Sequence, residues 1–152
     1  MASPPDVGDP APAFRLPSTQ GEIDLASELE KGDVLLVFYP GDETPVCTKQ
    51  LCDYRDNLEG FADLGVRVLA INPQSLSSHQ EFARKHALPF PLLSDEDKSV
   101  CRAYGAIGLL GMAKRALVLV GRDGRVRWRR SDLPIFHRSA DELRETIRGL
   151  NA

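Results

Sequence analysis

The sequence predicts an α/β domain in which a mixed central β-sheet is flanked by helices on both faces. Strand and helix patterns alternate through the first two thirds of the chain, an order that requires parallel strands joined by crossover helices. Two later strand patterns flank an Asp-Gly turn and add an antiparallel hairpin to the sheet. The 152 residues are 42% apolar, enough for one domain with a proper core. We therefore expect a single domain over residues 1–152, with residues 1–12 as a Pro-rich, irregular lead-in.

The elements of the first half follow from apolar patterns and helix-start signals. Residues 13–29 suggest a short strand, a turn at Gln20-Gly21 and a brief strand or helical turn. Residues 33–40, DVLLVFYP, predict a buried strand that ends at Pro40. The next helix is expected over 44–61, followed by a strand over 66–72. Thr44 is a good N-cap for that helix, and Pro45 suits its first position because the missing N–H costs nothing there.

The second half continues the alternation and then changes it. A helix opening with SSHQE has Ser78 and Glu81 as its capping box. The last helix of the chain is expected over 139–150, with Ser139 and Glu142 as its capping box and a buried stripe at Leu143, Ile147 and Leu150. The other expected elements are a strand over 90–95, a short helix over 96–106 ended by Gly105, a loop over 108–113, and a hairpin over 114–130 whose turn is Gly121 to Gly124.

Charge and apolar runs argue against several classes of protein. The net charge is −3, and the densest basic cluster, RVRWRR at 125–130, is too short for a nucleic-acid footprint. The longest apolar runs are of strand length, far below a membrane span. The N-terminus has no secretory signal, and three cysteines are an odd number for a disulfide scaffold. These features predict a cytoplasmic protein in a reducing compartment.

Two of the three cysteines lie in the stretch FYPGDETPVCTKQLCDYRD, residues 38–56. Cys47 falls in the first turn of the expected helix, where unpaired backbone N–H groups and the helix dipole favour a thiolate. It also heads an apolar stripe of one helix face, made of Cys47, Leu51, Tyr54, Leu58 and Phe61. Cys47 is therefore expected to face inward, at the mouth of a pocket beside the strand that ends at Pro40.

The second cysteine, Cys52, lies five residues further along the same helix. Helix geometry separates the two Cα atoms by about 8.6 Å, beyond the roughly 7 Å limit of an unstrained disulfide. A structural disulfide is thus not expected, whereas a disulfide made and broken in each turnover would require the helix to unwind locally. The alternative is that both cysteines are small buried hydrophobic residues, as free cysteines often are.

The same stretch resembles the peroxidatic motif of peroxiredoxins, specifically the subgroup called bacterioferritin comigratory protein or PrxQ. Its Pro-x-x-x-Thr-x-x-Cys signature is met by Pro40, Thr44 and Cys47, and its second cysteine by Cys52. FPLLSD, AYGA and KRALVLVGRDGRV extend the resemblance over nearly the whole chain. The resemblance implies a thioredoxin-like fold and the reduction of hydrogen peroxide and organic hydroperoxides. The chain departs from the family in having Val46 where glycine is common and Gly41 where lysine is common.

The resemblance also implies a role for each residue of the motif. Cys47 attacks the peroxide as a thiolate, Arg115 stabilises the charges, and Thr44 hydrogen-bonds substrate or thiolate. Pro40 covers the pocket, and Cys52 resolves the sulfenic acid as an intramolecular disulfide. Thioredoxin or a related dithiol then reduces that disulfide. The subgroup is often monomeric and sometimes dimeric, and a monomer is expected here.

Other residues are expected to have no part in the chemistry. Cys101 lies in a short helix and is interpreted as packing. The three histidines, at 79, 86 and 137, are scattered and predict no metal site. The sequence has no glycine-rich phosphate loop, so no nucleotide cofactor is expected. Two alternative functions remain: a thiol–disulfide oxidoreductase or redox chaperone of the same fold, which would need CxxC, and a non-enzymatic binding module.

Overall fold

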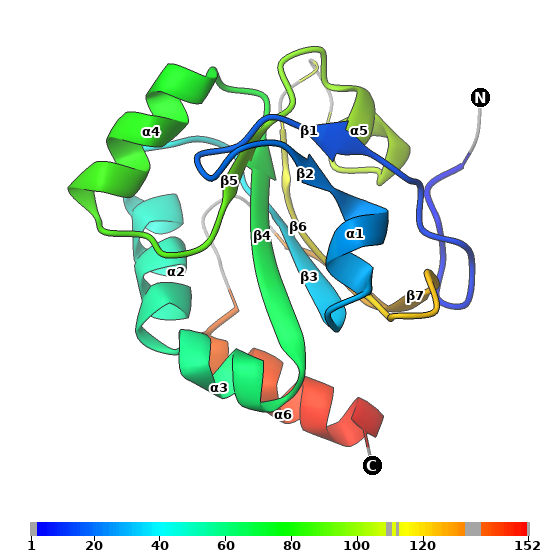
Figure 1. Ribbon diagram of the computed structural model, residues 1–152. Coiled ribbons are helices and arrows are strands. Elements are labelled where there is room, and N and C mark those ends of the chain that lie inside the picture. The colour runs from blue at the N-terminus through cyan, green and yellow to red at the C-terminus, as the bar shows by residue number, and fades with distance from the viewer. Residues whose placement is uncertain (1–2, 109–110, 112, 133–137, 152) are drawn as a thin grey trace.

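The computed structural model describes residues 3–108, 111, 113–132 and 138–151, and its core is a five-stranded sheet (Figure 1). The strand order is β5-β4-β3-β6-β7. β3 pairs in parallel with β4, and β4 with β5, while β6 lies antiparallel to both β3 and β7. The mixed sheet is therefore confirmed. The strands are β3 (Asp33–Phe38), β4 (Val66–Asn72), β5 (Leu92–Ser94), β6 (Arg115–Val120) and β7 (Val126–Asp132).

Helices cover both faces of this sheet, as Figure 1 shows. One face carries α2 (Pro45–Asp56), α3 (Leu58–Asp63), α4 (Leu76–Lys85) and α6 (Ala140–Asn151). The other carries α1 (Leu25–Leu29), α5 (Ser99–Ala103) and the small hairpin of β1 (Arg15–Leu16) and β2 (Ile23–Asp24). No helix among the described residues is long and apolar enough to cross a membrane.

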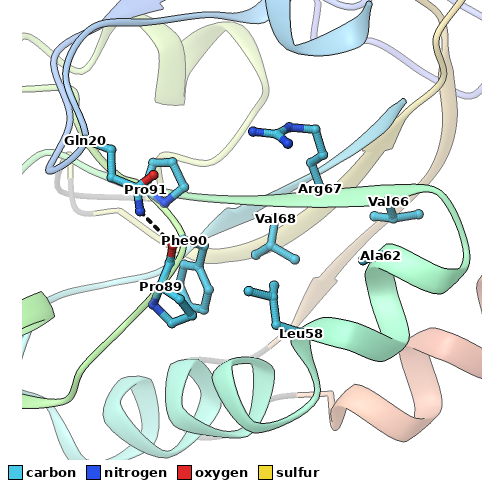
Figure 2. Close-up of a pocket in the computed structure, with 9 residues that line it drawn as sticks. All are labelled: Gln20, Leu58, Ala62, Val66, Arg67, Val68, Pro89, Phe90 and Pro91. Atoms are coloured by element: carbon cyan, nitrogen blue, oxygen red, sulfur yellow. Dashed lines mark hydrogen bonds between the residues drawn. The ribbon is translucent and has the colours of Figure 1, made fainter. Parts of the chain in front are cut away.

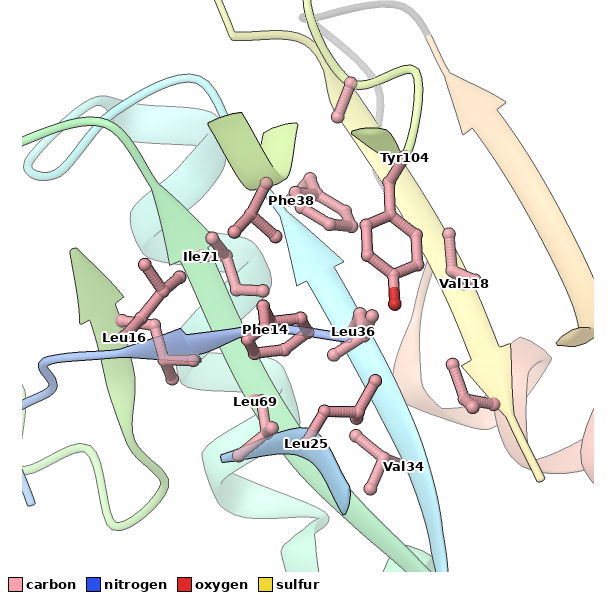
Figure 3. Packing of buried hydrophobic residues seen from close by; sticks show 14 of the residues in the cluster. Phe14, Leu16, Leu25, Val34, Leu36, Phe38, Leu69, Ile71, Tyr104 and Val118 are labelled. Atoms are coloured by element: carbon pink, nitrogen blue, oxygen red, sulfur yellow. The ribbon is translucent and has the colours of Figure 1, made fainter. Parts of the chain in front are cut away.

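The sequence of the central strand β3 has a run of apolar residues without alternating polar ones, and the position of β3 in the sheet explains this run. Successive side chains point to opposite faces. Leu36 and Phe38 join the cluster under α1 and α5, drawn in Figure 3, whereas Leu35 and Val37 join the cluster under α2 and α6. All four are fully buried. A strand covered on both faces needs apolar residues at every position.

The expected helix over 44–61 is wrong in its length, because the structure breaks it into α2 and α3 at Asn57. The Asn57 side chain donates to the backbone carbonyl of Asp53 at 2.9 Å, the group that a continuous helix would reserve for the Asn57 N–H. Instead the Asn57 N–H donates to the Tyr54 carbonyl, three residues back. Side-chain competition of this kind ends helices.

Two further details of the helices also differ from expectation. The N-cap of α4 is Ser75, whose hydroxyl accepts from the Ser78 N–H at 3.2 Å, so Ser78 and Glu81 are not its capping box. Ser78 instead faces Asp42, to which its hydroxyl donates. In α6 the stripe of Leu143 and Ile147 is buried, but Leu150 is 37% exposed, near the end of the helix.

The predicted hairpin and the end of the short helix are confirmed. The Gly124 N–H donates to the Gly121 carbonyl at 2.8 Å, and Gly124 has a φ of +82°, a conformation that glycine adopts without strain. α5 ends at Ala103, and Gly105, just past its C-cap Tyr104, has a φ of +74°. Of the expected loop over 108–113, residues 109, 110 and 112 lie outside the described residues.

Candidate active site

The sheet register brings Arg115 beside the helix that carries Cys47. Phe38, the last residue of β3, pairs with Ala116 of the antiparallel strand β6. Arg115, one residue earlier, therefore lies next to the segment that leaves β3 and enters α2. Its Nη2 atom donates to the Cys47 sulfur at 3.1 Å. The two residues are 68 positions apart in the sequence, so only the fold joins them.

This contact is shielded from water. Cys47 is 0% exposed and Arg115 is 1% exposed. A guanidinium does not lose its proton in proteins, and its attraction for a negative sulfur is weakened little by salt when both are buried. The first turn of α2 adds unpaired backbone N–H groups and the positive end of the helix dipole. The site thus places a fixed positive charge and the start of a helix beside the Cys47 sulfur.

The start of α2 is built as the sequence predicts in its backbone, but not in its side-chain cap. Thr44 has the extended N-cap conformation, its carbonyl accepts from the Thr48 N–H at 2.8 Å, and Pro45 follows at the start of the helix. The Thr44 side chain makes no capping bond. Its hydroxyl donates to the Gly41 carbonyl at 3.1 Å, and the residue is exposed. In this arrangement the hydroxyl belongs to the loop that leads into the helix.

Gln50 is a member of the site that the sequence reasoning missed. It is 0% exposed, one turn after Cys47 on the same helix face. Its carbonyl oxygen accepts from Arg115 Nη1, and its amide donates to the Tyr54 hydroxyl at 3.1 Å. That hydroxyl donates in turn to the Arg138 carbonyl at 2.8 Å. The signal was its spacing of three residues from Cys47, which places it on the inward face.

The other two predicted site residues are Pro40 and Cys52. Pro40 is half-buried and follows β3 directly after Tyr39. Cys52 is half-buried in α2, which is continuous between the two cysteines, and all three cysteines of the chain are free thiols. The structure therefore brings Cys47 and Arg115 together and leaves Cys52 further along the helix.

Comparisons with known proteins agree with this geometry. Residues 7–129 match the family model described as the AhpC/TSA family. The chain belongs to the AhpC/TSA family. The expected resemblance to the bacterioferritin comigratory protein and PrxQ subgroup is also confirmed. The chain is 45% identical over 102 residues to a Coxiella burnetii protein named as a peroxiredoxin, bcp, covering 67% of this chain and 68% of that one.

The chloroplast peroxiredoxin Q of Oryza sativa subsp. japonica is 43% identical over 98 residues, or 64% of this chain. The match spans 45% of that relative's length. Among solved structures, peroxidoxin BcpB from Mycobacterium tuberculosis aligns with a TM-score of 0.86 and 31% identity, covering 97% of this chain and 99% of that one. The fold is thus thioredoxin-like, as expected for this family, and a thiol peroxidase is the class of enzyme that family membership supports.

Cys101, the third cysteine of this AhpC/TSA family member, is buried on the opposite face of the sheet. Burial and the neighbouring Asp95 carboxylate raise the pKa of its thiol far above the ordinary cysteine range. Asp95 also accepts from the Cys101 backbone N–H at 2.7 Å. A thiol held neutral in this way is a poor nucleophile, which supports its interpretation as packing.

Within the described part of the chain, no group of three or more His, Cys, Asp or Glu residues could hold a metal ion. His137 lies outside the described residues.

A separate cavity of about 190 Å³, drawn in Figure 2, opens between α3, β4 and the segment before β5. Neither Cys47 nor Arg115 lines it. Its lining residues are Gln20, Leu58, Ala62, Val66, Arg67, Val68, Pro89, Phe90 and Pro91.

Proposed function

We propose that this protein is a thiol-dependent peroxidase that reduces hydrogen peroxide and organic hydroperoxides through Cys47. The observation that carries the proposal is the buried contact of 3.1 Å between Arg115 Nη2 and the Cys47 sulfur. It supplies a fixed positive charge to a cysteine at a helix start, the environment that activates a nucleophilic thiolate. The names of the bcp and peroxiredoxin Q relatives support the same reaction.

In the first step the Cys47 thiolate attacks one peroxide oxygen and the O–O bond breaks. Cys47 becomes a sulfenic acid, and the leaving alkoxide or hydroxide takes a proton to become an alcohol or water. Arg115 and the N–H groups of Val46 and Cys47 face the charge that develops. Thr44 would turn its hydroxyl to the bound peroxide, and Pro40 would limit the entry of water.

In the second step the Cys52 thiol attacks the Cys47 sulfenic sulfur, releasing water and forming a disulfide. The two cysteines lie on a continuous helix, at a separation of about 8.6 Å between Cα atoms, so the first turns of α2 must unwind for the bond to form. Cys52 is half-buried rather than locked in the core. A dithiol, thioredoxin or a related carrier, then returns two electrons and two protons by exchange.

Intact-mass spectrometry after one equivalent of peroxide tests both steps. Wild-type protein is expected to form an intramolecular disulfide, and Cys52→Ser is expected to stop at the sulfenic acid. Cys47→Ser should consume no peroxide, whereas the control Cys101→Ala should behave as wild type. Peroxide turnover by Cys47→Ser would exclude the assigned nucleophile. A normal thioredoxin-linked rate in Cys52→Ser would exclude the assigned resolving residue.

A further inference from the structure

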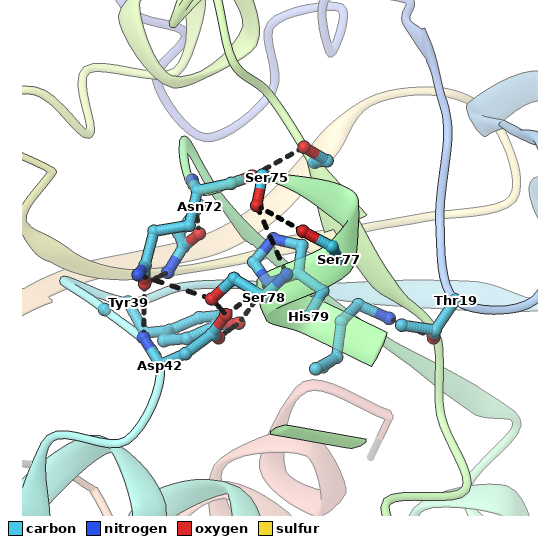
Figure 4. Close-up of polar contacts among 12 residues, drawn as sticks. Thr19, Tyr39, Asp42, Asn72, Ser75, Ser77, Ser78 and His79 are labelled. Atoms are coloured by element: carbon cyan, nitrogen blue, oxygen red, sulfur yellow. Dashed lines mark hydrogen bonds and ion pairs between the residues drawn. The ribbon is translucent and has the colours of Figure 1, made fainter. Parts of the chain in front are cut away.

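A buried polar cluster in the loop before α2 takes no part in the chemistry proposed above (Figure 4). At its centre is Asp42, five residues before Cys47. The Asp42 side chain is 1% exposed and that of His79, on α4, is 0% exposed. Buried carboxylates and imidazoles are rare unless they are fully hydrogen-bonded, so this cluster calls for a physical account.

Asp42 is held by partners from three parts of the fold. One carboxylate oxygen accepts from the Tyr39 hydroxyl at 2.6 Å. The other accepts from the Ser78 hydroxyl at 2.7 Å and lies 2.7 Å from His79 Nδ1. The Asp42 backbone N–H donates to the Gln74 side-chain carbonyl. The loop is thus fixed at both the side chain and the backbone of one residue.

His79 extends the connection to the sheet. Its second ring nitrogen, Nε2, lies 3.1 Å from the Leu93 carbonyl oxygen in β5. A carbonyl and an ionised carboxylate can only accept, so a ring that carries a proton on both nitrogens satisfies both contacts. Ser78 bonds the carboxylate and not the ring, so the three residues do not form a Ser-His-Asp nucleophile relay.

The buried contact between Asp42 and His79 is costly to break. Removing one partner of a buried pair leaves an uncompensated charge in the interior. The chain next to it is also strained, because Glu43 has a φ of +64°, in the left-handed region that side chains other than glycine disfavour. Glu43 is anchored from outside by Lys85 at 3.0 Å. The loop therefore keeps its shape through contacts to α4 and β5, and not through its own preference.

This fixed loop leads into the turn that must unwind. Thr44 and Pro45 come directly after Glu43, and Cys47 completes the first turn of α2. As long as Asp42 is anchored, the chain enters α2 in the direction that sets Cys47 against Arg115. Freeing the loop would favour the unwound turn, in which Cys47 leaves Arg115 and reaches Cys52.

We propose that Asp42 and His79 are positioning residues that hold the helix start in its peroxide-reactive form and so set the balance between that form and the disulfide-forming one. The inference rests on the proposed function. It predicts opposite effects on two steps: a weaker anchor slows the attack of Cys47 on peroxide and speeds the formation of the disulfide. Faster disulfide formation leaves less sulfenic acid for a second peroxide, which would oxidise it to the sulfinic acid and release alcohol or water.

The test compares Asp42→Asn and Ser78→Ala with the control Glu81→Gln. Glu81 forms an exposed pair with Arg84 on the same helix. Rapid-quench intact mass under excess peroxide gives the attack rate and the ratio of sulfinic acid to disulfide. Asp42→Asn should lower both by roughly tenfold, Ser78→Ala by less, and Glu81→Gln should leave both unchanged. Equal slowing of attack and resolution, or no change in the ratio, would overturn the proposal.

Hydrogen exchange of the reduced proteins separates positioning from general destabilisation. Exchange should accelerate more in peptides covering 40–52 than in β6, even in Ser78→Ala, which leaves the contact between Asp42 and His79 intact. An equal acceleration in residues 40–52 and in β6 would mean a merely structural role and would overturn the proposal. If Cys47→Ser still consumed peroxide, the proposed function would fail. If Cys47→Ser is inactive but Asp42→Asn leaves the ratio of sulfinic acid to disulfide unchanged, only the positioning role of Asp42 and His79 would fail.

His79 variants distinguish the two contacts of the ring. His79→Asn places an amide near Nδ1 and can donate to Asp42, while His79→Gln reaches toward the Leu93 carbonyl instead. His79→Asn should therefore retain more of the attack rate than His79→Gln. The reverse order would show that the bond to β5, and not the pair with Asp42, carries the effect.

Discussion

At the scale of single residues, the guanidinium of Arg115 does two things at once. One of its nitrogens donates to the Cys47 sulfur and the other to Gln50. Gln50 is itself held through Tyr54. A fork of fixed shape can satisfy both partners, whereas the single point charge of a lysine cannot. The geometry thus depends on arginine and not only on a positive charge.

Arg115→Lys is therefore expected to keep the charge but lose much of the activity. The rate of peroxide reaction should fall by about a hundredfold, the scale seen when one fixed donor to a developing charge is lost. Stopped-flow or competition kinetics with reduced protein measure this rate. Arg122→Lys, in the exposed hairpin turn, is the matched control and should react as wild type. A rate for Arg115→Lys within twofold of wild type would contradict the assigned role of the fork.

Asp42 gives a pH dependence of stability whose sign follows from its surroundings. Burial alone would raise the pKa of the Asp42 carboxyl, but hydrogen bonds from His79, Ser78 and Tyr39 outweigh it and hold the pKa below the ordinary value. A lowered pKa stabilises the fold above the unfolded-state value of about 3.9. That contribution is lost as the pH falls through the lowered folded-state value.

The free energy of unfolding of Asp42→Asn should therefore lie about 3 kcal/mol or more below that of wild type near neutral pH. The gap should narrow as the pH falls below about 4, because the wild-type carboxyl is then increasingly neutral. Urea unfolding of both proteins across this range measures the gap. A gap that stays constant with pH would mean that Asp42 contributes no ionised pair.

Candidate site residues could be proposed from the sequence where a local signal or a motif marks them, and they were missed where only the fold brings their partners together. Cys47 and Thr44 could be proposed as site residues because helix-start signals are local, and Arg115 because a family motif marks it. Gln50 and His79 were missed because their contacts depend on partners 65 and 37 positions away. A stripe drawn from apolar residues also leaves out a buried glutamine on the same face.

At the scale of elements, the sequence predicted which segments form strands and helices, but it did not predict where the helices begin and end. The split at Asn57 depends on whether its side chain takes the Asp53 carbonyl, and periodicity does not report this. The start of α4 depends on Ser75 in place of Ser78, a choice among three serines that all suit a cap. Ends are decided by single hydrogen bonds, whereas elements are decided by many residues.

The end of α4 offers a change that should stabilise the fold. Ala87 follows the C-cap with a φ of +50° and is exposed. Glycine adopts this left-handed conformation without the steric penalty that alanine incurs. Ala87→Gly should raise the free energy of unfolding by about 0.5–1 kcal/mol. Ala83→Gly, the same change inside α4, should lower it by about 1 kcal/mol, and chemical denaturation compares the two. A loss of stability in Ala87→Gly would contradict the argument from backbone conformation.

At the scale of the whole molecule, the chain order predicted the parallel half of the sheet, but the neighbours of β6 come only from the fold. The described part of the expected lead-in, residues 3–12, is attached to the edge strand β7. The Gly8 N–H donates to the Val126 carbonyl at 2.8 Å, and the Val126 N–H donates to the Asp9 carbonyl at 3.0 Å. Arg125 Nη1 donates to the Gly8 carbonyl at 2.8 Å. The lead-in therefore satisfies backbone groups at the start of β7.

Removing residues 1–9 is thus expected to have two effects. The lost hydrogen bonds should lower the free energy of unfolding by about 1–3 kcal/mol. The freed edge of β7 also becomes a template for pairing with a second chain, so a protein that we expect to be monomeric should gain a dimer as its concentration rises. Thermal unfolding and sedimentation velocity measure the two effects. The variant Asp6→Ala, which keeps the segment and removes one exposed side chain, is the control and should remain monomeric. If the truncated protein stays monomeric at the highest concentrations, the exposed edge of β7 does not recruit a second chain. The lead-in would then not be needed to protect this edge from dimerisation.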